Sequence, residues 1–248
     1  MEYHNKALEI SLAVFGERHP DVATCYNNIG LVYGNQGNYS QALEYYNKAL
    51  EIWLAVFGEQ HPNVALSYNN IGYVYDNQSN YSQALEYYNK ALEIWLAVFG
   101  EQYPDVATCY NNMGTVYDDQ SNYSQALEYY NKALEIRLAV FGEQHPDVAT
   151  CYHNIGTVYS IQGNYSQALE YFNKALEIWL AVFGEQHPNV AASYAYIAAI
   201  LFRQGNYQDS LGYFEKSYNI LNDLLPSDHP RLLQIQKIYE LVKSNISE

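Results

Sequence analysis

The chain has 248 residues and a formal net charge of −15, from 27 acidic and 12 basic side chains. This balance argues against nucleic acids and anionic membranes as partners, because both are held by lysine and arginine. No apolar run approaches the roughly 18 residues of a membrane span, and the N-terminus has neither the basic start nor the apolar run of a signal peptide. We therefore expect a cytoplasmic protein.

One motif is copied along the chain, which explains its 28 tyrosines. Phe-Gly recurs every 42 residues from Phe15 to Phe183, and proline recurs with the same step from Pro20 to Pro230. A fixed period of this length predicts a repeat protein.

The repeats divide the whole chain into one predicted solenoid domain. Met1 to Tyr3 aligns with Leu43 to Tyr45, so the chain starts within the second helix of a repeat. The predicted segments are a half repeat at 1–18, five full repeats at 19–60, 61–102, 103–144, 145–186 and 187–228, and a capping helix at 229–248.

The first helix of each repeat is expected to begin after His-Pro, because proline suits the first helical turn. Tyr26, Ile29, Gly30 and Tyr33 then form one packing stripe at spacings i, i+3, i+4 and i+7. The helix is expected to stop near Gly37, and Asn-Tyr-Ser turns the chain.

The second helix is expected to end at Phe-Gly, where Gly58 should form a left-handed cap. Gly30 and Ala49 are small, which predicts close approach of neighbouring helices. The apolar residues of this second helix, again at helical spacing, are Ala42, Leu43, Tyr46, Ala49, Leu50 and Trp53.

These residues carry a family resemblance. The run from Tyr26 to Tyr33, Y-x-x-I-G-x-x-Y, followed by Ala42-x-x-x-Tyr46 and Ala49, resembles the tetratricopeptide pattern W-x-x-L-G-x-x-Y…A-x-x-x-F. The 42-residue period, the FGE-x-HP linker and the Asn-Asn pair are similar to the repeats of kinesin light chain. The resemblance implies an all-α fold, an alpha-alpha superhelix (TPR solenoid) of about twelve antiparallel helices with a C-terminal capping helix.

The first helix carries a second stripe, opposite the packing stripe. In the tetratricopeptide family such positions face a concave groove and contact extended peptides, and the resemblance implies the same role here. The candidate peptide-binding residues are Asn27, Asn28, Leu31, Asn69, Asn70, Tyr73, Asp76, Asn111, Asn112, Thr115, Asp118, Asp119, His153, Asn154 and Thr157.

Chemistry supports this reading independently, because asparagine both donates and accepts hydrogen bonds and a row of asparagines suits a peptide backbone. The copies differ from one another mainly on this stripe, as expected of a surface that reads a ligand, although neutral drift at solvated positions would look the same. The first four repeats have no Lys or Arg there, and Asp76, Asp118 and Asp119 make the middle negative. The expected partner is therefore a neutral or basic protein or peptide.

Other motifs favour ordinary structural roles. The recurrent histidines lie one repeat apart, too far for a shared metal ion, and are taken as helix-entry residues. His153 alone stands among the asparagines and could tune binding near neutral pH. The tryptophan position is Ser11 and Arg137 in other copies, which suggests partial exposure. The three cysteines occupy the same repeat position, too far apart to pair, and are expected to be free thiols.

The predicted function is a non-enzymatic scaffold for protein–protein interactions. No nucleophile elbow, phosphate loop or paired-carboxylate motif is present, so we predict no enzyme activity, no metal and no cofactor. Two alternatives stay open: a structural array that self-assembles through the open N-terminal end near Tyr3 and Ala7, giving a homo-oligomer, and a sensor module of a larger multidomain protein.

Overall fold

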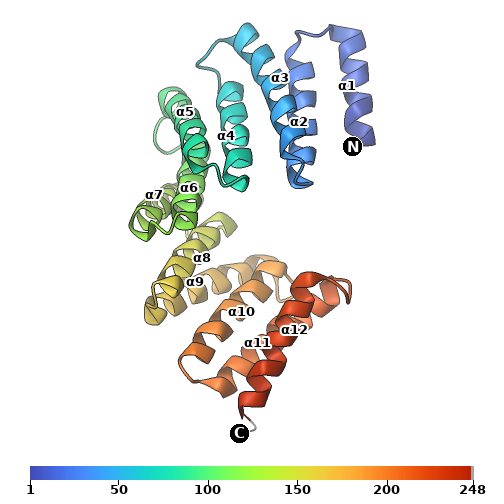
Figure 1. Cartoon of the computed structure of the whole chain (residues 1–248). Helices are drawn as coiled ribbons and strands as arrows, with labels where there is room; N and C mark the ends of the chain where they lie inside the picture. The colour runs from blue at the N-terminus through green and yellow to red at the C-terminus, as the bar shows by residue number, and fades with distance from the viewer. Residues whose placement is uncertain (247–248) are drawn as a thin grey trace. The chain divides into compact units, whose positions relative to one another are not determined.

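The computed structural model describes residues 1–246, and all regular structure in that range is helical (Figure 1). The helices are α1 (Glu2–Phe15), α2 (Pro20–Asn35), α3 (Tyr39–Phe57), α4 (Pro62–Asn77), α5 (Tyr81–Phe99), α6 (Pro104–Asp119), α7 (Tyr123–Phe141), α8 (Pro146–Ile161), α9 (Tyr165–Phe183), α10 (Pro188–Arg203), α11 (Tyr207–Leu224) and α12 (Pro230–Ile246). The all-α prediction is confirmed.

The helices form two compact units, Met1–Ile136 and Arg137–Glu248, and the boundary falls within α7. In each unit a helix packs against the helices that precede and follow it, as antiparallel hairpins of a solenoid do. In unit 1 the first helices of successive repeats also approach one another directly, α2 to α4 and α4 to α6.

The first helix of each full repeat begins at the predicted proline. The preceding histidine is the N-cap: Nδ1 of His19 accepts the backbone N–H of Asp21 at 3.2 Å, and His61, His145 and His187 act in the same way. This bond satisfies a donor that the first turn leaves without a partner. The histidines are therefore helix-entry residues, as expected.

The second helix begins two residues earlier than the predicted turn allowed. Asn38 is its N-cap, and its side-chain oxygen accepts the backbone N–H of Gln41 at 3.4 Å, so Tyr39 and Ser40 are already helical. The Asn-Tyr-Ser motif is thus a capping sequence and not a separate turn.

The cap expected at Gly58 is corrected by the structure. Gly58 has φ 80° and ψ 175°, whereas a left-handed cap has ψ near +47°. Its N–H still bonds the carbonyl of Leu54 at 3.0 Å, but the chain extends at once toward the next His-Pro. Essentially only glycine adopts this backbone region, which accounts for its recurrence at this point.

Close approach within each hairpin depends on the glycine of the first helix. A Cβ added to Gly30 would stand 2.8 Å from Cδ1 of Tyr46, which is fully buried on the second helix. Ala49 is also fully buried. The small residues therefore act as predicted, by making room for a neighbouring ring.

The last helix closes unit 2. Val242 of α12 is fully buried against Ala198 and Phe214 of the fifth repeat, while Lys237 and Lys243 are exposed. Helix α12 thus packs on the apolar surface of the fifth repeat and exposes its lysines to solvent. No helix in the described residues is long and apolar enough to cross a membrane.

Candidate functional site

All candidate residues lie on the first helices of the repeats, on α2, α4 and α6 in unit 1 and on α8 in unit 2. We call the surface that these positions form within each unit the first-helix face of that unit. Its side chains differ in accessibility. Leu31 and Tyr73 are 47% and 43% exposed, and Asp119 is also exposed. Asn27 is buried at 8% exposure, and the other candidates are half-buried.

Asparagines of successive repeats bond to one another in unit 1. Nδ2 of Asn70 donates to Oδ1 of Asn27 at 2.9 Å, and Nδ2 of Asn112 donates to Oδ1 of Asn69 at 3.1 Å. Some of the amide groups that we expected to bind a peptide backbone therefore bond to each other between neighbouring helices. This corrects the picture of a row of freely available amides, because these bonds hold neighbouring first helices in register.

The two threonines of the face bond to their own helices. Thr115 Oγ1 donates to the carbonyl of Asn111 at 3.2 Å, and Thr157 Oγ1 donates to the carbonyl of His153 at 3.0 Å. Thr115 Oγ1 also accepts the hydroxyl of Tyr130 at 3.2 Å. Each threonine hydroxyl therefore uses its one hydrogen within its own helix and has none left to donate to a ligand.

Acidic side chains gather where α4 and α6 meet. Oδ1 of Asp76 and Oδ1 of Asp118 are covered by protein and have no hydrogen-bond partner within the described part of the chain. Burial, with a smaller contribution from the charge of Asp119, raises the pKa of Asp76 from 3.8 to about 6. The same two causes, in the same order, raise the pKa of Asp118.

A tyrosine hydroxyl without a partner lies at this acidic cluster. Tyr88 is fully buried, and its hydroxyl makes no hydrogen bond. Burial raises its pKa, and the neighbouring charge of Asp76 adds to the effect. In the next repeat the equivalent tyrosine, Tyr130, donates its hydroxyl hydrogen to Thr115. In the repeat of Tyr88 the position of Thr115 is occupied by Tyr73, whose side chain is exposed.

His153 is enclosed by aromatic rings in unit 2. Its ring lies 5.2 Å from that of Phe172, 5.5 Å from that of Trp179 and 4.9 Å from that of Tyr196, centroid to centroid. Burial, helped by the charge of Arg231, lowers its pKa from 6.5 to about 4. His153 is therefore neutral at pH 7, and the idea that it tunes binding near neutral pH is wrong.

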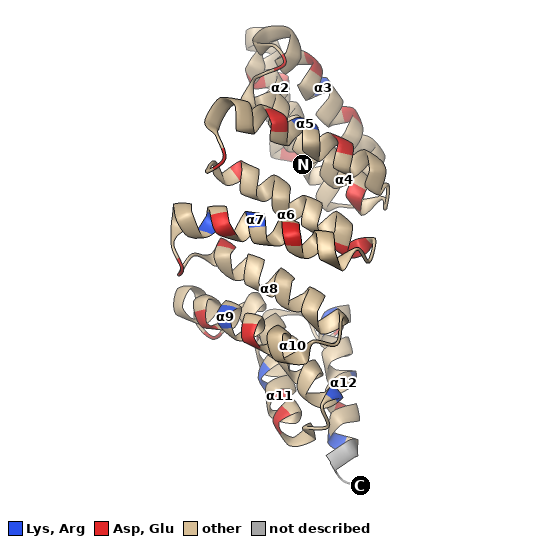
Figure 2. Ribbon diagram, turned by 90° about the vertical axis from the view of Figure 1, so that its left-hand side faces the viewer, with Lys and Arg blue, Asp and Glu red and all other residues tan. Residues whose placement is uncertain are grey.

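Sequence reasoning missed a cavity in unit 2. It has a volume of about 750 Å³ and lies between α10, α11 and α12, with Phe214 and Ile235 among its lining residues. Basic residues are spread along α12 (Figure 2), and its Arg231 joins Arg203 of α10 in lining the cavity. The α10 residues that line it are Ala192, Ala195, Tyr196, Ala199, Phe202 and Arg203.

Five of those α10 residues could have been found from the repeat period. Ala192, Ala195, Tyr196, Ala199 and Arg203 are the fifth-repeat copies of Thr24, Asn27, Asn28, Leu31 and Asn35. Alanine replaces the first asparagine of the pair there, which removes an amide and leaves space. The first-helix face of unit 2 is thus apolar and hollow at its last repeat.

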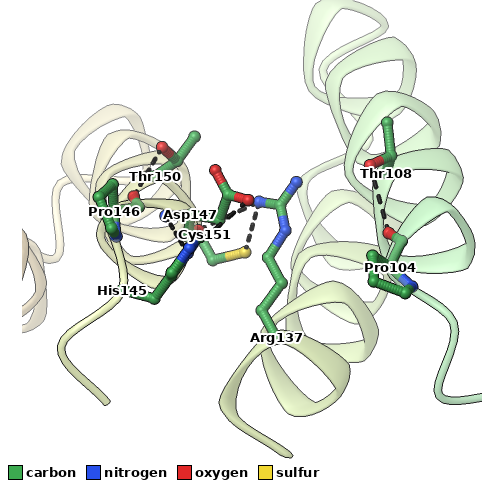
Figure 3. A network of polar contacts seen from close by, with 8 residues as sticks. All are labelled: Pro104, Thr108, Arg137, His145, Pro146, Asp147, Thr150 and Cys151. Carbon is green, nitrogen blue, oxygen red and sulfur yellow. Dashed lines mark hydrogen bonds and ion pairs between the residues drawn. The ribbon is translucent and has the colours of Figure 1, made fainter. Parts of the chain in front are cut away.

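The tryptophan position is buried, contrary to the expectation of partial exposure. Trp53, Trp95 and Trp179 are 2–3% exposed, and Arg137 at the equivalent position is 8% exposed. Figure 3 shows the Arg137 side chain reaching the start of α8, where Nη1 donates to the carbonyl of Asp147 at 3.1 Å and to Sγ of Cys151 at 3.2 Å. Arginine is tolerated because its donors find acceptors, and not because the site is open to water.

The cysteines are free thiols, and Cys109 and Cys151 are fully buried. Burial raises the pKa of the Cys151 thiol, although the charge of Arg137 opposes this shift. In the described part of the chain, no group of three or more His, Cys, Asp or Glu side chains is placed to hold a metal ion.

Hairpins of one period, each packed on the next, define the chain as an α-solenoid repeat protein. The tetratricopeptide repeat family matches it at residues 2–53, 27–96, 77–139, 119–179 and 158–223. Because these overlapping matches cover most of the sequence, the chain belongs to the tetratricopeptide repeat family.

Solved structures show the same fold at low sequence identity. BtubC (BKLC) from P. vanneervenii has a TM-score of 0.77 at 22% identity, with 92% of each chain covered. The nearly identical TPR-like repeats of a kinesin light chain-like protein of Podosopora anserina have a TM-score of 0.67 at 18% identity, covering 84% of this chain and 99% of that one. The predicted likeness to kinesin light chain repeats is confirmed.

A third similar structure contains a peptide. The Rap conjugation gene regulator of plasmid pLS20, in complex with the Phr* peptide, has a TM-score of 0.73 at 19% identity, covering 91% of this chain and 60% of that one. No curated protein matches this chain by sequence.

Proposed function

We propose that this chain is a non-enzymatic protein-interaction scaffold that binds an extended, neutral or basic segment of a partner protein on the first-helix face of unit 1. The tetratricopeptide family and the peptide held by the Rap regulator support a binding role for this fold. The residues that we assign to binding there are the candidate residues on α2, α4 and α6, with Leu31 and Tyr73 as the main apolar contacts. The candidate residues on α8 belong to unit 2 and are assigned to its own first-helix face.

One observation carries the proposal. Leu31 and Tyr73 occupy the same repeat position on α2 and α4, and both are large, apolar and exposed. Half-buried asparagines, including Asn28 and Asn70, lie one helical turn before them. Apolar side chains beside fixed amides are the mixture that an extended peptide needs, because it presents side chains and backbone groups in alternation.

Charge favours a neutral or basic partner. The chain carries a net charge of −15, and the acidic cluster of α4 and α6 lies on the same face. An acidic segment would be repelled there, whereas a basic one would be attracted from a distance. Salt should therefore weaken the binding of basic peptides, since it screens exposed charges.

The test is a screen of a random peptide library against the wild-type chain, followed by affinity measurements on the selected peptides. Leu31→Ala and Tyr73→Ala should each weaken the selected peptides about tenfold, the effect of losing a buried apolar contact. Val98→Ala is the matched control, because Val98 is 43% exposed on α5, the second helix of the Tyr73 repeat. Equal affinity for all these variants would refute binding on the first-helix face.

Self-association is a second candidate function. Tyr3 and Ile10 of α1 are 88% and 56% exposed, so this helix leaves apolar side chains uncovered. Such side chains can pack against a second copy of the chain. Light scattering across a concentration series tests this, and Tyr3→Ser with Ile10→Ser should reduce the apparent mass at high concentration. A mass that is independent of concentration in the wild type would rule the candidate out.

A further inference from the structure

We infer that the acidic cluster of α4 and α6 is a specific subsite for the cationic head group of a lysine or arginine side chain carried by the bound peptide. The cluster consists of Asp76, Asp118 and Asp119, with the hydroxyl of Tyr88 beside it. This inference rests on the proposed function and adds to it the identity and place of one peptide residue.

The carboxylates are held together by the fold itself. Asp76 and Asp118 occupy the same repeat position on α4 and α6, 42 residues apart, and these two helices approach one another directly. Asp119 follows Asp118 and acts electrostatically on both Asp76 and Asp118. The arrangement therefore gathers negative charge around Asp119 on the first-helix face of unit 1.

The cluster lacks the donors that its acceptors require. Among the described residues, Oδ1 of Asp76 and Oδ1 of Asp118 are covered and have no hydrogen-bond partner, and no ion pair involves either residue. A carboxylate oxygen that is covered by protein normally accepts a hydrogen bond, even where the residue as a whole is half-buried, because a covered polar atom without a partner is disfavoured. A cationic group from outside would supply what is missing.

The hydroxyl of Tyr88 gives independent support for a ligand. It belongs to α5, is fully buried and has no hydrogen-bond partner among the described residues, and it is near enough to Asp76 and Tyr73 for their charges to raise its pKa. A phenol hydroxyl can accept a hydrogen bond as well as donate one. An ammonium or guanidinium group placed between Asp76 and Tyr88 would satisfy both side chains.

The chemistry selects a cationic side chain over a metal ion. In the described residues, no set of three metal-ligating side chains converges here. Lysine offers three donors and arginine five, which suits scattered single acceptors better than the close coordination sphere of a metal. The exposed ring of Tyr73 at the rim of the cluster can also cover the aliphatic part of a long basic side chain.

The experiment is a double-mutant cycle on a peptide selected from the library. Its basic residues are replaced one at a time by norleucine, and each peptide is measured against the wild-type chain and against the Asp76→Asn, Asp118→Asn variant. At one basic position, norleucine should weaken binding to the wild type between tenfold and a hundredfold, the range of about 1.5–3 kcal/mol for a hydrogen bond to a charged group. The same replacement should change binding to the variant less than about twofold.

The double variant Glu93→Gln, Glu135→Gln is the control, because both glutamates are exposed, on α5 and α7, and the substitutions remove the same two charges elsewhere in the same two repeats. This variant should keep the full effect of norleucine. Equal losses on the wild type and the Asp76→Asn, Asp118→Asn variant would overturn the subsite while leaving peptide binding intact. Selected peptides without any basic residue would do the same, and a screen that selects no peptide would overturn both proposals.

Discussion

Asn70 of the second full repeat donates a hydrogen bond of 2.9 Å from Nδ2 to Oδ1 of Asn27 in the first, and Asn27 is only 8% exposed. The bond joins α2 to α4 across the face that we propose for binding. These amides therefore determine the spacing of the first helices as well as the chemistry of the surface between them.

Asn70→Ala should lower the free energy of unfolding by about 1–2 kcal/mol, because it leaves the covered oxygen of Asn27 without a donor. Urea unfolding followed by circular dichroism measures this. Asn28→Ala is the control, since Asn28 has the same position in the preceding repeat and no comparable inter-repeat bond among the described residues. An equal loss of stability in both variants would contradict the structural role of the Asn27–Asn70 bond.

Arg137→Trp should stabilise the chain. Among the described residues, the partners of the buried guanidinium of Arg137 are a carbonyl and a thiol, both uncharged, whereas Trp95 fills the equivalent site beside Cys109, the equivalent of Cys151. Replacing a poorly compensated buried charge by a well-packed apolar side chain is expected to raise the free energy of unfolding by about 1–3 kcal/mol. The midpoint of urea unfolding should rise, and the reverse change Trp95→Arg should lower it. A lower midpoint for Arg137→Trp would show that the site is adapted to arginine.

Much of this structure follows from local sequence rules. The first helices begin at Pro20 and its copies, and Gly30 allows close approach to Tyr46. Both features depend on residues within one repeat. The order of the helices follows from the period. The all-α solenoid could therefore be predicted without coordinates.

Relationships between repeats could not be predicted in the same way. The Asn27–Asn70 bond depends on the offset between two hairpins, which no local pattern encodes. Arg137 looked exposed because charged residues usually are, and its acceptors belong to the following helix. The cavity arises where Ala195 and Ala199 replace larger side chains of other repeats, which the period does show. It also depends on the packing of α12, which lies outside the repeat and which the period does not place.

Ser79→Gly and Ser121→Gly should each stabilise the chain by about 1 kcal/mol. Both serines have φ 59°, in the left-handed region that is unfavourable for a residue with a Cβ, and the corresponding turns of other repeats use Gly37, Gly163 and Gly205. Thermal or urea unfolding of the single and double variants measures the gain. The reverse substitution Gly163→Ser should cost a similar amount. A loss of stability on introducing glycine would mean that the serine side chains contribute contacts that outweigh the backbone strain.

The raised pKa of Asp76 should make the effect of Asp76→Asn depend on pH. The pKa rises from 3.8 to about 6 in the folded chain, so the folded state disfavours the ionised form. Below pH 3.8 the carboxyl is protonated in both states and contributes nothing. Between pH 3.8 and about 6 the unfolded chain loses the proton first, so stability falls with rising pH, and above pH 6 the full penalty is present.

Asparagine cannot ionise, so Asp76→Asn should remove that penalty. The variant should therefore be more stable than the wild type by about 1–3 kcal/mol at pH 7.5, and the gain should shrink toward zero near pH 4. Urea unfolding at a series of pH values measures this difference, with Glu93→Gln as the charge-matched control. If the difference in free energy of unfolding between the variant and the wild type is the same at both ends of the pH range, Asp76 ionises in the folded chain as easily as in water. Burial then does not raise its pKa.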